Sequence, residues 1–313
     1  MKTVTLPGHT KPVSRIMLGA TGVGLRNYKE SETLLDNALR FGINALDTAR
    51  VYGDSEDAVG RWMAERGNRE SIFVLTKGAH PSDRHRVTPE DITADLMESL
   101  RRLQTDYVDA YLLHRDDETS AVGPIMDIFY EHYKAGRIRS FGGSNWRHQR
   151  IAEANAYAAA KNQPLITAVS PNYSLCDQVE DPWGGGCVSI SGKAGAAGRE
   201  FYKKNNIAVF AYSSLGGGVL SGRATRENYQ EVLSGPAKKG YAYEINFARL
   251  DRARELAAKK GVSVPQISLA YLLNQPLRVI PLVAAVNEHE LAEAAAATDI
   301  LLTEEECAWL DNW

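Results

Sequence analysis

The stretch from Ile72 to Leu113 reads IFVLTKGAHPSDRHRVTPEDITADLMESLRRLQTDYVDAYLL and has the pattern of a strand–helix–strand unit. Its ends, Ile72–Thr76 and Tyr107–Leu113, are short and mainly apolar runs, which are typical of strands buried on both faces in a parallel sheet. Between them, Thr88-Pro89-Glu90 supplies a capping residue and a proline where a helix begins. The stretch therefore predicts two parallel strands joined by a helix.

The same alternation continues toward both ends of the chain. The predicted strands are Val13–Ala20, Ala45–Thr48, Ile72–Thr76, Tyr107–Leu113, Ser140–Gly143, Thr167–Ser170, Ile207–Tyr212 and Val279–Val283. The predicted helices that follow them are Lys29–Arg40, Ser55–Glu65, the segment after Thr88, Gly123–Ala135, Arg147–Ala160, Lys193–Lys204, Phe247–Lys260 and Glu288–Ala297. This number of strand–helix pairs favours an α/β fold of the closed (β/α)8 type, a TIM barrel, over a doubly wound sheet, which normally needs fewer strands.

Three regions fall outside this alternation. Thr3–Leu6 and Lys11–Ser14 flank Pro7-Gly8-His9-Thr10 and predict an N-terminal β-hairpin that closes one end of the barrel. The connections Leu175–Ser191 and Leu215–Asn246 are too long for routine turns, so we expect them to contribute to the functional site. No linker divides the chain, and residues 1–313 are expected to form a single barrel domain.

Composition narrows the class of protein. Hydrophobic residues make up 44% and charged residues 24% of the chain, which is typical of a globular protein. A net charge of −3 gives no general attraction to nucleic acid or acidic lipid, and no apolar run approaches the roughly 18 residues of a membrane span. The N-terminus lacks the pattern of a signal peptide. The three cysteines, Cys176, Cys187 and Cys307, predict neither disulfides nor a metal site. We expect a reduced, cytoplasmic protein.

Four polar side chains are expected at the carboxyl ends of neighbouring strands, where barrels of this class carry their active sites. Asp47, Lys77 and His114 end the second, third and fourth predicted strands, and Tyr52 follows Asp47 in the next loop. Taken singly, each has an ordinary structural interpretation, such as a turn cap, a strand-end cation or a buried histidine. Together they form a set that suits proton transfer to an alkoxide.

The chemistry of this set rests on the phenol. A phenol titrates near about pH 10 in water, and a neighbouring cation favours the phenolate. Lys77 can provide that cation, and Asp47 can hold its ammonium group in place. We therefore expect Tyr52 to act as general acid, with His114 as the donor that orients the substrate.

These residues carry a resemblance to a known family. GINALDTARVYG (residues 42–53) and GRIRSFGGSNW (residues 136–146) resemble the two signatures of the aldo-keto reductases, and the resemblance spans essentially the whole chain. It implies a (β/α)8 barrel that binds a nicotinamide cofactor across the strand ends. It also implies NAD(P)H-dependent reduction of an aldehyde or ketone to an alcohol, or the reverse oxidation, with the tetrad Asp47, Tyr52, Lys77 and His114.

The resemblance also implies cofactor-binding residues. Ser144 and Asn145 hold the nicotinamide carboxamide, Tyr212 stacks on the ring, and Ser170 stands where the family usually has a further carboxamide-binding glutamine. Ser214, Leu215 and Gly216 lie along the pyrophosphate, and the glycine-rich stretch SSLGGGVLSG (213–222) can bring backbone N–H groups close to phosphate oxygens.

The sequence departs from the family pattern where the adenosine 2′-phosphate of the cofactor is usually bound. The family usually binds the adenosine 2′-phosphate of NADP(H) with a lysine or arginine after the eighth strand, but no such residue occurs from Pro281 to Trp313. NADP(H) and NAD(H) are both candidate cofactors, and we expect a weak or reversed preference for NADPH. Arg223, Arg226, Lys238 and Lys239 in the loop after the seventh strand are the alternative source of a cation.

The rim also predicts a class of substrate. Trp146, Asp116 and Trp183 are expected on rim loops, and their aromatic and polar character suits a sugar-like carbonyl compound. Two alternatives stay open at this point. One is a nicotinamide-binding regulatory subunit of the same fold, which would bind a partner protein and turn over little substrate. The other is a Schiff-base lyase that uses Lys77. The intact tetrad favours the reductase.

Overall fold

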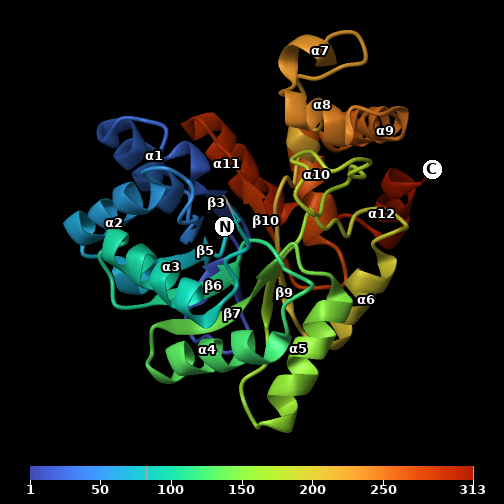
Figure 1. Ribbon diagram of the computed structural model, residues 1–313. Coiled ribbons are helices and arrows are strands. Elements are labelled where there is room, and N and C mark those ends of the chain that lie inside the picture. The colour runs from blue at the N-terminus through green and yellow to red at the C-terminus, as the bar shows by residue number, and fades with distance from the viewer. Residues whose placement is uncertain (82–83, 313) are drawn as a thin grey trace.

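The computed structural model describes residues 1–81 and 84–312 and contains a closed barrel of parallel strands surrounded by helices (Figure 1). Neighbouring barrel strands are consecutive in the chain, and β10 closes the ring by pairing with β3. The barrel strands are β3 (Met17–Gly19), β4 (Ala45–Asp47), β5 (Phe73–Gly78), β6 (Val108–Leu113), β7 (Ile138–Ser144), β8 (Ala168–Ser170), β9 (Ala208–Ala211) and β10 (Val279–Val283). The predicted (β/α)8 barrel is confirmed.

The helices predicted after the strands are all present, with ends that differ by a few residues. They are α1 (Tyr28–Arg40), α2 (Ser55–Arg66), α3 (Pro89–Arg102), α4 (Val122–Lys134), α5 (His148–Ala160), α6 (Ala196–Lys204), α9 (Glu244–Lys260) and α11 (Glu288–Ala296). The Thr88 side chain caps α3 by accepting a hydrogen bond from Asp91 N, and Pro89 follows it, as the sequence predicts. None of the helices in the described ranges is both long enough and apolar enough to cross a membrane.

The structure also contains helices outside the predicted set. They are α7 (Tyr229–Val232), α8 (Gly235–Tyr241), α10 (Val264–Leu273) and α12 (Glu304–Asp311), with the short 3-10 helices η1 (Ala20–Gly22), η2 (Arg69–Ser71), η3 (Gly216–Gly218) and η4 (Ala297–Asp299). In α10 every residue from Ile267 to Leu273 is buried, so the apolar residues surround the helix and give no amphipathic period. The segment predicted as one long loop, Leu215–Asn246, instead contains η3, α7 and α8.

The first predicted strand, Val13–Ala20, was too long and is corrected by the structure. Its beginning belongs to β2 (Pro12–Ser14), which pairs antiparallel with β1 (Thr3–Thr5) in the predicted N-terminal hairpin. Only Met17–Gly19 enters the barrel as β3. The chain changes from one sheet to the other at Arg15 and Ile16, directly after the polar residue Ser14.

The hairpin closes the end of the barrel at which the strands begin. Leu6 and Val13 are buried in the core that fills the barrel, together with Phe73, Leu112 and Phe210 from the strands. A second and larger core lies between the strands and the surrounding helices. The predicted closure of one barrel end by the hairpin is thereby confirmed.

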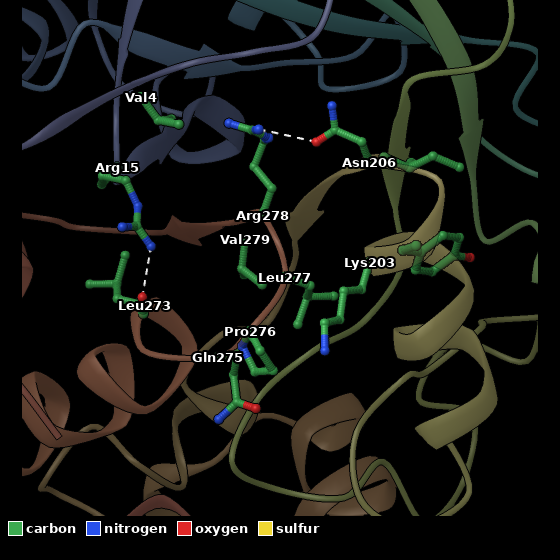
Figure 2. Close-up of a pocket in the computed structure, with 12 residues that line it drawn as sticks. Val4, Arg15, Lys203, Asn206, Leu273, Gln275, Pro276, Leu277, Arg278 and Val279 are labelled. Carbon is green, nitrogen blue, oxygen red and sulfur yellow. Dashed lines mark hydrogen bonds between the residues drawn. The ribbon is translucent and has the colours of Figure 1, made fainter. Parts of the chain in front are cut away.

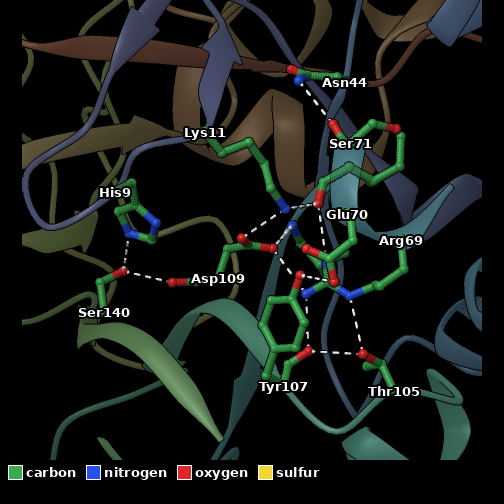
Figure 3. A network of polar contacts seen from close by, with 12 residues as sticks. His9, Lys11, Asn44, Arg69, Glu70, Ser71, Thr105, Tyr107, Asp109 and Ser140 are labelled. Atoms are coloured by element: carbon green, nitrogen blue, oxygen red, sulfur yellow. Dashed lines mark hydrogen bonds and ion pairs between the residues drawn. The ribbon is translucent and has the colours of Figure 1, made fainter. Parts of the chain in front are cut away.

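A polar network holds the hairpin segment against the strands (Figure 3). The buried Asp109 carboxylate on β6 lies 3.0 Å from Lys11 Nζ and 2.9 Å from Arg69 Nη2, and it also accepts a hydrogen bond from Val74 N. His9 Nε2 lies 3.1 Å from Ser140 Oγ. Asp109, Lys11 and Arg69 thus satisfy one another within the protein, and the network has a structural role.

A cavity of about 390 Å³ lies at the same end, between the hairpin and the starts of β9 and β10 (Figure 2). Its two arginines are engaged by carbonyl groups. Arg15 Nη2 donates to the Leu273 carbonyl at the end of α10, at 2.8 Å. Arg278 donates to the Thr5 carbonyl at 2.8 Å and to Asn206 Oδ1 at 3.1 Å. The carboxyl end of α10 attracts the charge of Arg15, and Arg278 has two protein acceptors, so these contacts explain both arginines without a ligand.

Candidate active site

The four side chains predicted to carry the chemistry lie at the opposite end of the barrel. Asp47 is the last residue of β4, Lys77 lies near the end of β5, and His114 directly follows β6. Because β4, β5 and β6 are parallel neighbours, these residues share one rim. Tyr52 reaches the same rim from the loop between β4 and α2, where its ring centre lies 5.5 Å from that of His114.

Two tight turns hold the backbone of Tyr52. Its N–H donates to the Ala49 carbonyl at 2.9 Å, and its carbonyl accepts from Ser55 N at 3.1 Å, where α2 begins. Gly24 packs so closely on this turn that a Cβ at that position would lie 2.8 Å from the Tyr52 carbonyl oxygen. A larger residue than glycine at position 24 would therefore displace Tyr52 from the rim.

A buried ion pair supports the phenol. Lys77 Nζ lies 2.6 Å from Asp47 Oδ1 and donates to the Thr48 carbonyl at 3.0 Å. Burial acts to lower the pKa of Lys77, but the Asp47 carboxylate and the Tyr52 phenol outweigh it and hold that pKa above its ordinary value. Lys77 Nζ also lies 5.0 Å from the centre of the Tyr52 ring. A charged ammonium is thus fixed beside the phenol.

His114 is a buried and neutral imidazole. Burial lowers its pKa well below the ordinary value, and the charges of Lys77, Arg115 and His80 lower it further. Its ring packs edge-on against that of His80, with the centres 4.9 Å apart. His114 Nδ1 is buried and has no hydrogen-bond partner in the part of the chain that the structure describes. A neutral ring nitrogen without a partner is suited to contact a bound molecule.

Asn145 is the centre of a second group on the same rim. Its Oδ1 accepts from the Tyr212 hydroxyl at 2.7 Å, and its Nδ2 donates to the His114 carbonyl at 3.2 Å and to Ser144 Oγ at 3.1 Å. Ser144 Oγ donates to the Ser170 carbonyl at 2.9 Å. The four residues predicted to surround the nicotinamide ring are therefore brought together, next to His114.

Unusual backbone conformations mark the same rim. Ala79 after β5, Asn145 after β7 and Ser213 after β9 have positive φ angles of 57°, 60° and 50°. Residues other than glycine rarely adopt this left-handed conformation, and such positions concentrate at functional sites. Sequence reasoning overlooked this feature, because neither alanine nor serine indicates a left-handed residue.

Comparison with known proteins identifies the family. The model of the aldo/keto reductase family matches residues 15–313. This chain belongs to the aldo/keto reductase family. It is therefore an oxidoreductase enzyme, and reduction of small-molecule carbonyl compounds with a nicotinamide cofactor is typical of the family.

Individual family members match along most of the chain. The aldo-keto reductase YhdN of Bacillus subtilis is 29% identical over 92% of this chain and 85% of that protein. The aryl-alcohol dehydrogenase [NADP(+)] of Phanerodontia chrysosporium is 26% identical over 98% of this chain and 84% of its own length. A crystal structure of a thermostable aldo-keto reductase with the inhibitor epalrestat covers 99% of both chains at 26% identity, with a TM-score of 0.75.

The rim of this aldo/keto reductase fits a nicotinamide group. Amide and hydroxyl groups of Ser144 and Asn145 lie beside the aromatic ring of Tyr212 and near the unpartnered nitrogen of His114. Ser214 Oγ donates to the Leu282 carbonyl at 2.6 Å and fastens the following Leu215–Gly216 turn to β10. Gly216 has a φ of 58°, and a Cβ there would lie 2.6 Å from Cys176 Sγ, so this turn requires glycine.

The residues predicted to contact substrate occupy three different environments. Trp146 is only 1% exposed and packs against Gly143, and Asp116 is paired with Arg150 at 3.3 Å. Their placement gives no support to a role in substrate binding. Trp183, by contrast, is 53% exposed, and its ring centre lies 6.0 Å from that of Tyr212. Among the described residues no group of metal-ligating side chains gathers on this rim or elsewhere.

Two side chains on the rim are missing from the predicted site. His80 packs against His114, and Arg115 donates to the His114 carbonyl at 3.1 Å. Both lie within three residues of a tetrad member in the chain, namely Lys77 for His80 and His114 for Arg115. Proximity of a titratable side chain to a strand-end residue is the signal that identifies them.

Proposed function

We propose that this aldo/keto reductase reduces an aldehyde or ketone to an alcohol with NAD(P)H, with Tyr52 as the proton donor. The observation that carries the proposal is the buried Lys77–Asp47 pair, which lies beside Tyr52 on the rim that also bears the neutral His114. A phenol alone is a poor acid at neutral pH, and a fixed ammonium group next to it stabilises the phenolate that remains after proton transfer.

Each tetrad residue has a separate task in this proposal. When bound, the nicotinamide cofactor supplies the hydride that the carbonyl carbon accepts. His114, as a neutral donor, orients the carbonyl oxygen, and Tyr52 gives its proton to the oxygen as negative charge develops there. Lys77 stabilises the Tyr52 phenolate, and Asp47 keeps Lys77 charged and in place. In the reverse oxidation the Tyr52 phenolate acts as the base and takes the proton from the alcohol.

Ser144, Asn145 and Ser170 would hold the carboxamide, Tyr212 would lie against the ring, and Ser214, Leu215 and Gly216 would follow the pyrophosphate. Several of these groups already hydrogen-bond to one another, so we expect the Tyr212–Asn145 contact to rearrange when the cofactor binds. Trp183 beside Tyr212 supports a sugar-like substrate, because an exposed aromatic face can cover the apolar side of a sugar ring.

Cofactor preference follows from the charges after β10. The Glu290 carboxylate accepts a hydrogen bond from Val286 N at 2.9 Å, and Glu288 is paired with Arg40, so the start of α11 presents carboxylates. A 2′-phosphate near this segment would meet these carboxylates, and it would have to compete with Glu288 for the guanidinium group of Arg40. We therefore propose that NADH is usable and that the NADPH preference is weak or reversed.

Two of the four cations in the loop after β9, which were the predicted alternative source of a phosphate contact, already have partners in the protein. Arg226 is paired with Glu244 and Asp251, both at 2.7 Å, and Lys238 Nζ donates to the Gln230 carbonyl. Arg223 and Lys239 stay candidates for a phosphate contact. Arg226, held by two carboxylates, is a poor one.

A carbonyl panel tests the proposed function. The protein is mixed with NADPH or NADH and with aldehydes and ketones, and loss of the reduced cofactor's absorbance is followed. We expect turnover of at least one small aldehyde. Cofactor binding by fluorescence with no turnover of any carbonyl compound would instead support the regulatory alternative, and a borohydride-trapped adduct on Lys77 would support the lyase.

A further inference from the structure

Arg115 is a cation on the catalytic rim that the proposed mechanism does not use. It is half-buried and directly follows His114, and its two terminal nitrogens have weak partners. Nη1 donates to the His114 carbonyl at 3.1 Å, and Nη2 lies 3.7 Å from Cys187 Sγ. No carboxylate within residues 1–81 and 84–312 lies at ion-pair distance from its guanidinium group.

Carboxylates are close to Arg115 along the chain, but they are engaged elsewhere. Asp116 pairs with Arg150 at 3.3 Å, and Asp117 accepts hydrogen bonds from Thr119 and Ser120. Asp181, in the loop that covers Arg115, accepts backbone N–H groups of Trp183, Gly184 and Cys187. Because these acids are satisfied by other donors, no carboxylate in the described part of the chain serves as a counterion for Arg115.

Arg115 lies beside the reacting region, because its Nη1 donates to the carbonyl of His114, whose ring packs against that of His80. Its charge contributes to the lowered pKa of both His114 and His80. The loop segment facing it is Gly184-Gly185-Gly186, and a Cβ at Gly185 would lie 3.6 Å from Arg115 Nε. Around Gly185 the covering loop therefore brings backbone close to the guanidinium group, and the Cys187 thiol is its neighbouring side chain.

We propose that Arg115 binds an oxyanionic group of the substrate, so that the enzyme acts on an aldehyde or ketone that carries a carboxylate or a phosphate. This inference rests on the proposed carbonyl reduction. A guanidinium group offers paired donors that match either oxyanion, and such charge-assisted pairs are stronger than hydrogen bonds to neutral hydroxyls. A phosphorylated sugar aldehyde would satisfy both Arg115 and the exposed ring of Trp183.

Two matched substrate pairs provide the test. One pair is 4-carboxybenzaldehyde and 4-methylbenzaldehyde, and the other is glyceraldehyde 3-phosphate and glyceraldehyde, so the two pairs separate carboxylate from phosphate. For at least one substrate pair we expect kcat/KM to be about tenfold or more higher for the anionic member. This is the difference expected from one charge-assisted hydrogen bond. The preference should weaken as salt concentration rises.

Variants assign the preference to Arg115. Arg115→Gln should remove most of the anionic preference while changing kcat/KM for the neutral member much less, and Arg115→Lys should retain part of it. Arg147→Gln is the matched control, because Arg147 lies on the neighbouring rim loop but is paired with Glu118 at 3.4 Å. This control should leave the preference unchanged.

Three outcomes would overturn the inference. The first is that the wild type has equal kcat/KM for the charged and the neutral member of both substrate pairs. This result would overturn the role of Arg115 and leave the proposed reductase function standing. Equal losses for all substrates in Arg115→Gln would mean that Arg115 only positions His114 and the covering loop. Turnover of no carbonyl compound at all would instead remove the proposed function on which the inference depends.

Discussion

The buried pair of Lys77 and Asp47 links the stability of the protein to its chemistry. Lys77 Nζ and Asp47 Oδ1 are 2.6 Å apart, and both side chains are at most 4% exposed. A buried charge that loses its partner is costly, whereas removal of both charges is much less so. The pair therefore allows the catalytic and the structural contributions of Lys77 to be separated.

Lys77→Met should abolish most turnover and also destabilise the protein by about 3–5 kcal/mol, because the Asp47 carboxylate stays buried without its ammonium partner. The double variant Lys77→Met/Asp47→Asn should recover much of the stability but none of the activity. Thermal unfolding and steady-state rates measure the two effects. Recovery of activity in the double variant would exclude Lys77 as the support of the phenol.

Because the pKa of His114 is lowered by folding, we expect the stability of the folded protein to depend on pH. Its pKa is well below 6.5 in the folded protein because it is buried beside cations, whereas in the unfolded chain it takes up a proton at ordinary pH values. The unfolded state thus binds more protons below about pH 6.5, and stability falls as the pH drops through that range. His114→Asn should show a smaller fall in Tm between about pH 7.5 and pH 5.5.

The fall should be reduced rather than abolished in this variant. Burial also lowers the pKa of His9, His80 and His132, so these histidines contribute in the same direction. An unchanged pH dependence of Tm in His114→Asn would show that the His114 imidazole is not held neutral by the fold.

At the level of elements, the proposed cofactor preference rests on the start of α11. Val286 lies in the segment after β10 in which the family usually carries a cation for the 2′-phosphate, and it is 55% exposed, so a longer side chain fits there. The wild type should bind NADH and NADPH with similar affinity, or NADH more tightly. Val286→Arg should raise NADPH affinity relative to NADH by about ten- to a hundredfold, as a charge-assisted hydrogen bond predicts.

Tryptophan fluorescence titrations with both reduced cofactors, at low and high salt, measure this change without any turnover. Leu301→Arg is a suitable control, since Leu301 is an exposed apolar residue between η4 and α12. Wild-type binding of NADPH more than about tenfold tighter than NADH, with steep salt dependence, would contradict the prediction. It would point to Arg223 or Lys239 as the phosphate partner.

Across the whole molecule, alternation of apolar runs and helical segments was sufficient to predict the barrel and the rim on which Asp47, Lys77 and His114 meet. Parallel strands place their ends together, so strand-end residues can be grouped from sequence alone. The same reasoning fails where tertiary contacts decide the structure. The buried run from Ile267 to Leu273 in α10 lacks an amphipathic period, and the one strand predicted at Val13–Ala20 is divided between two sheets.

Pairing within the site was also beyond the reach of the sequence. Asp116 and Arg115 are adjacent in the chain, and only the fold directs Asp116 to Arg150 and leaves Arg115 without a carboxylate partner among the described residues. Likewise, Trp146 lies close to the end of a strand, as Lys77 and His114 do. Its side chain nevertheless packs into the core. Strand-end position predicts the rim a residue belongs to, and packing decides whether its side chain faces the site.

The central claim is that Tyr52 donates the proton, and one comparison tests it most directly. Steady-state reduction of a carbonyl substrate is measured for the wild type, Tyr52→Phe and the control Tyr28→Phe, whose hydroxyl instead contacts Glu65 on the surface. Tyr52→Phe should lower kcat by about 10²–10⁴-fold while cofactor still binds, because only the acid is lost. Near-normal kcat in Tyr52→Phe, equal to that of the control, would contradict the account.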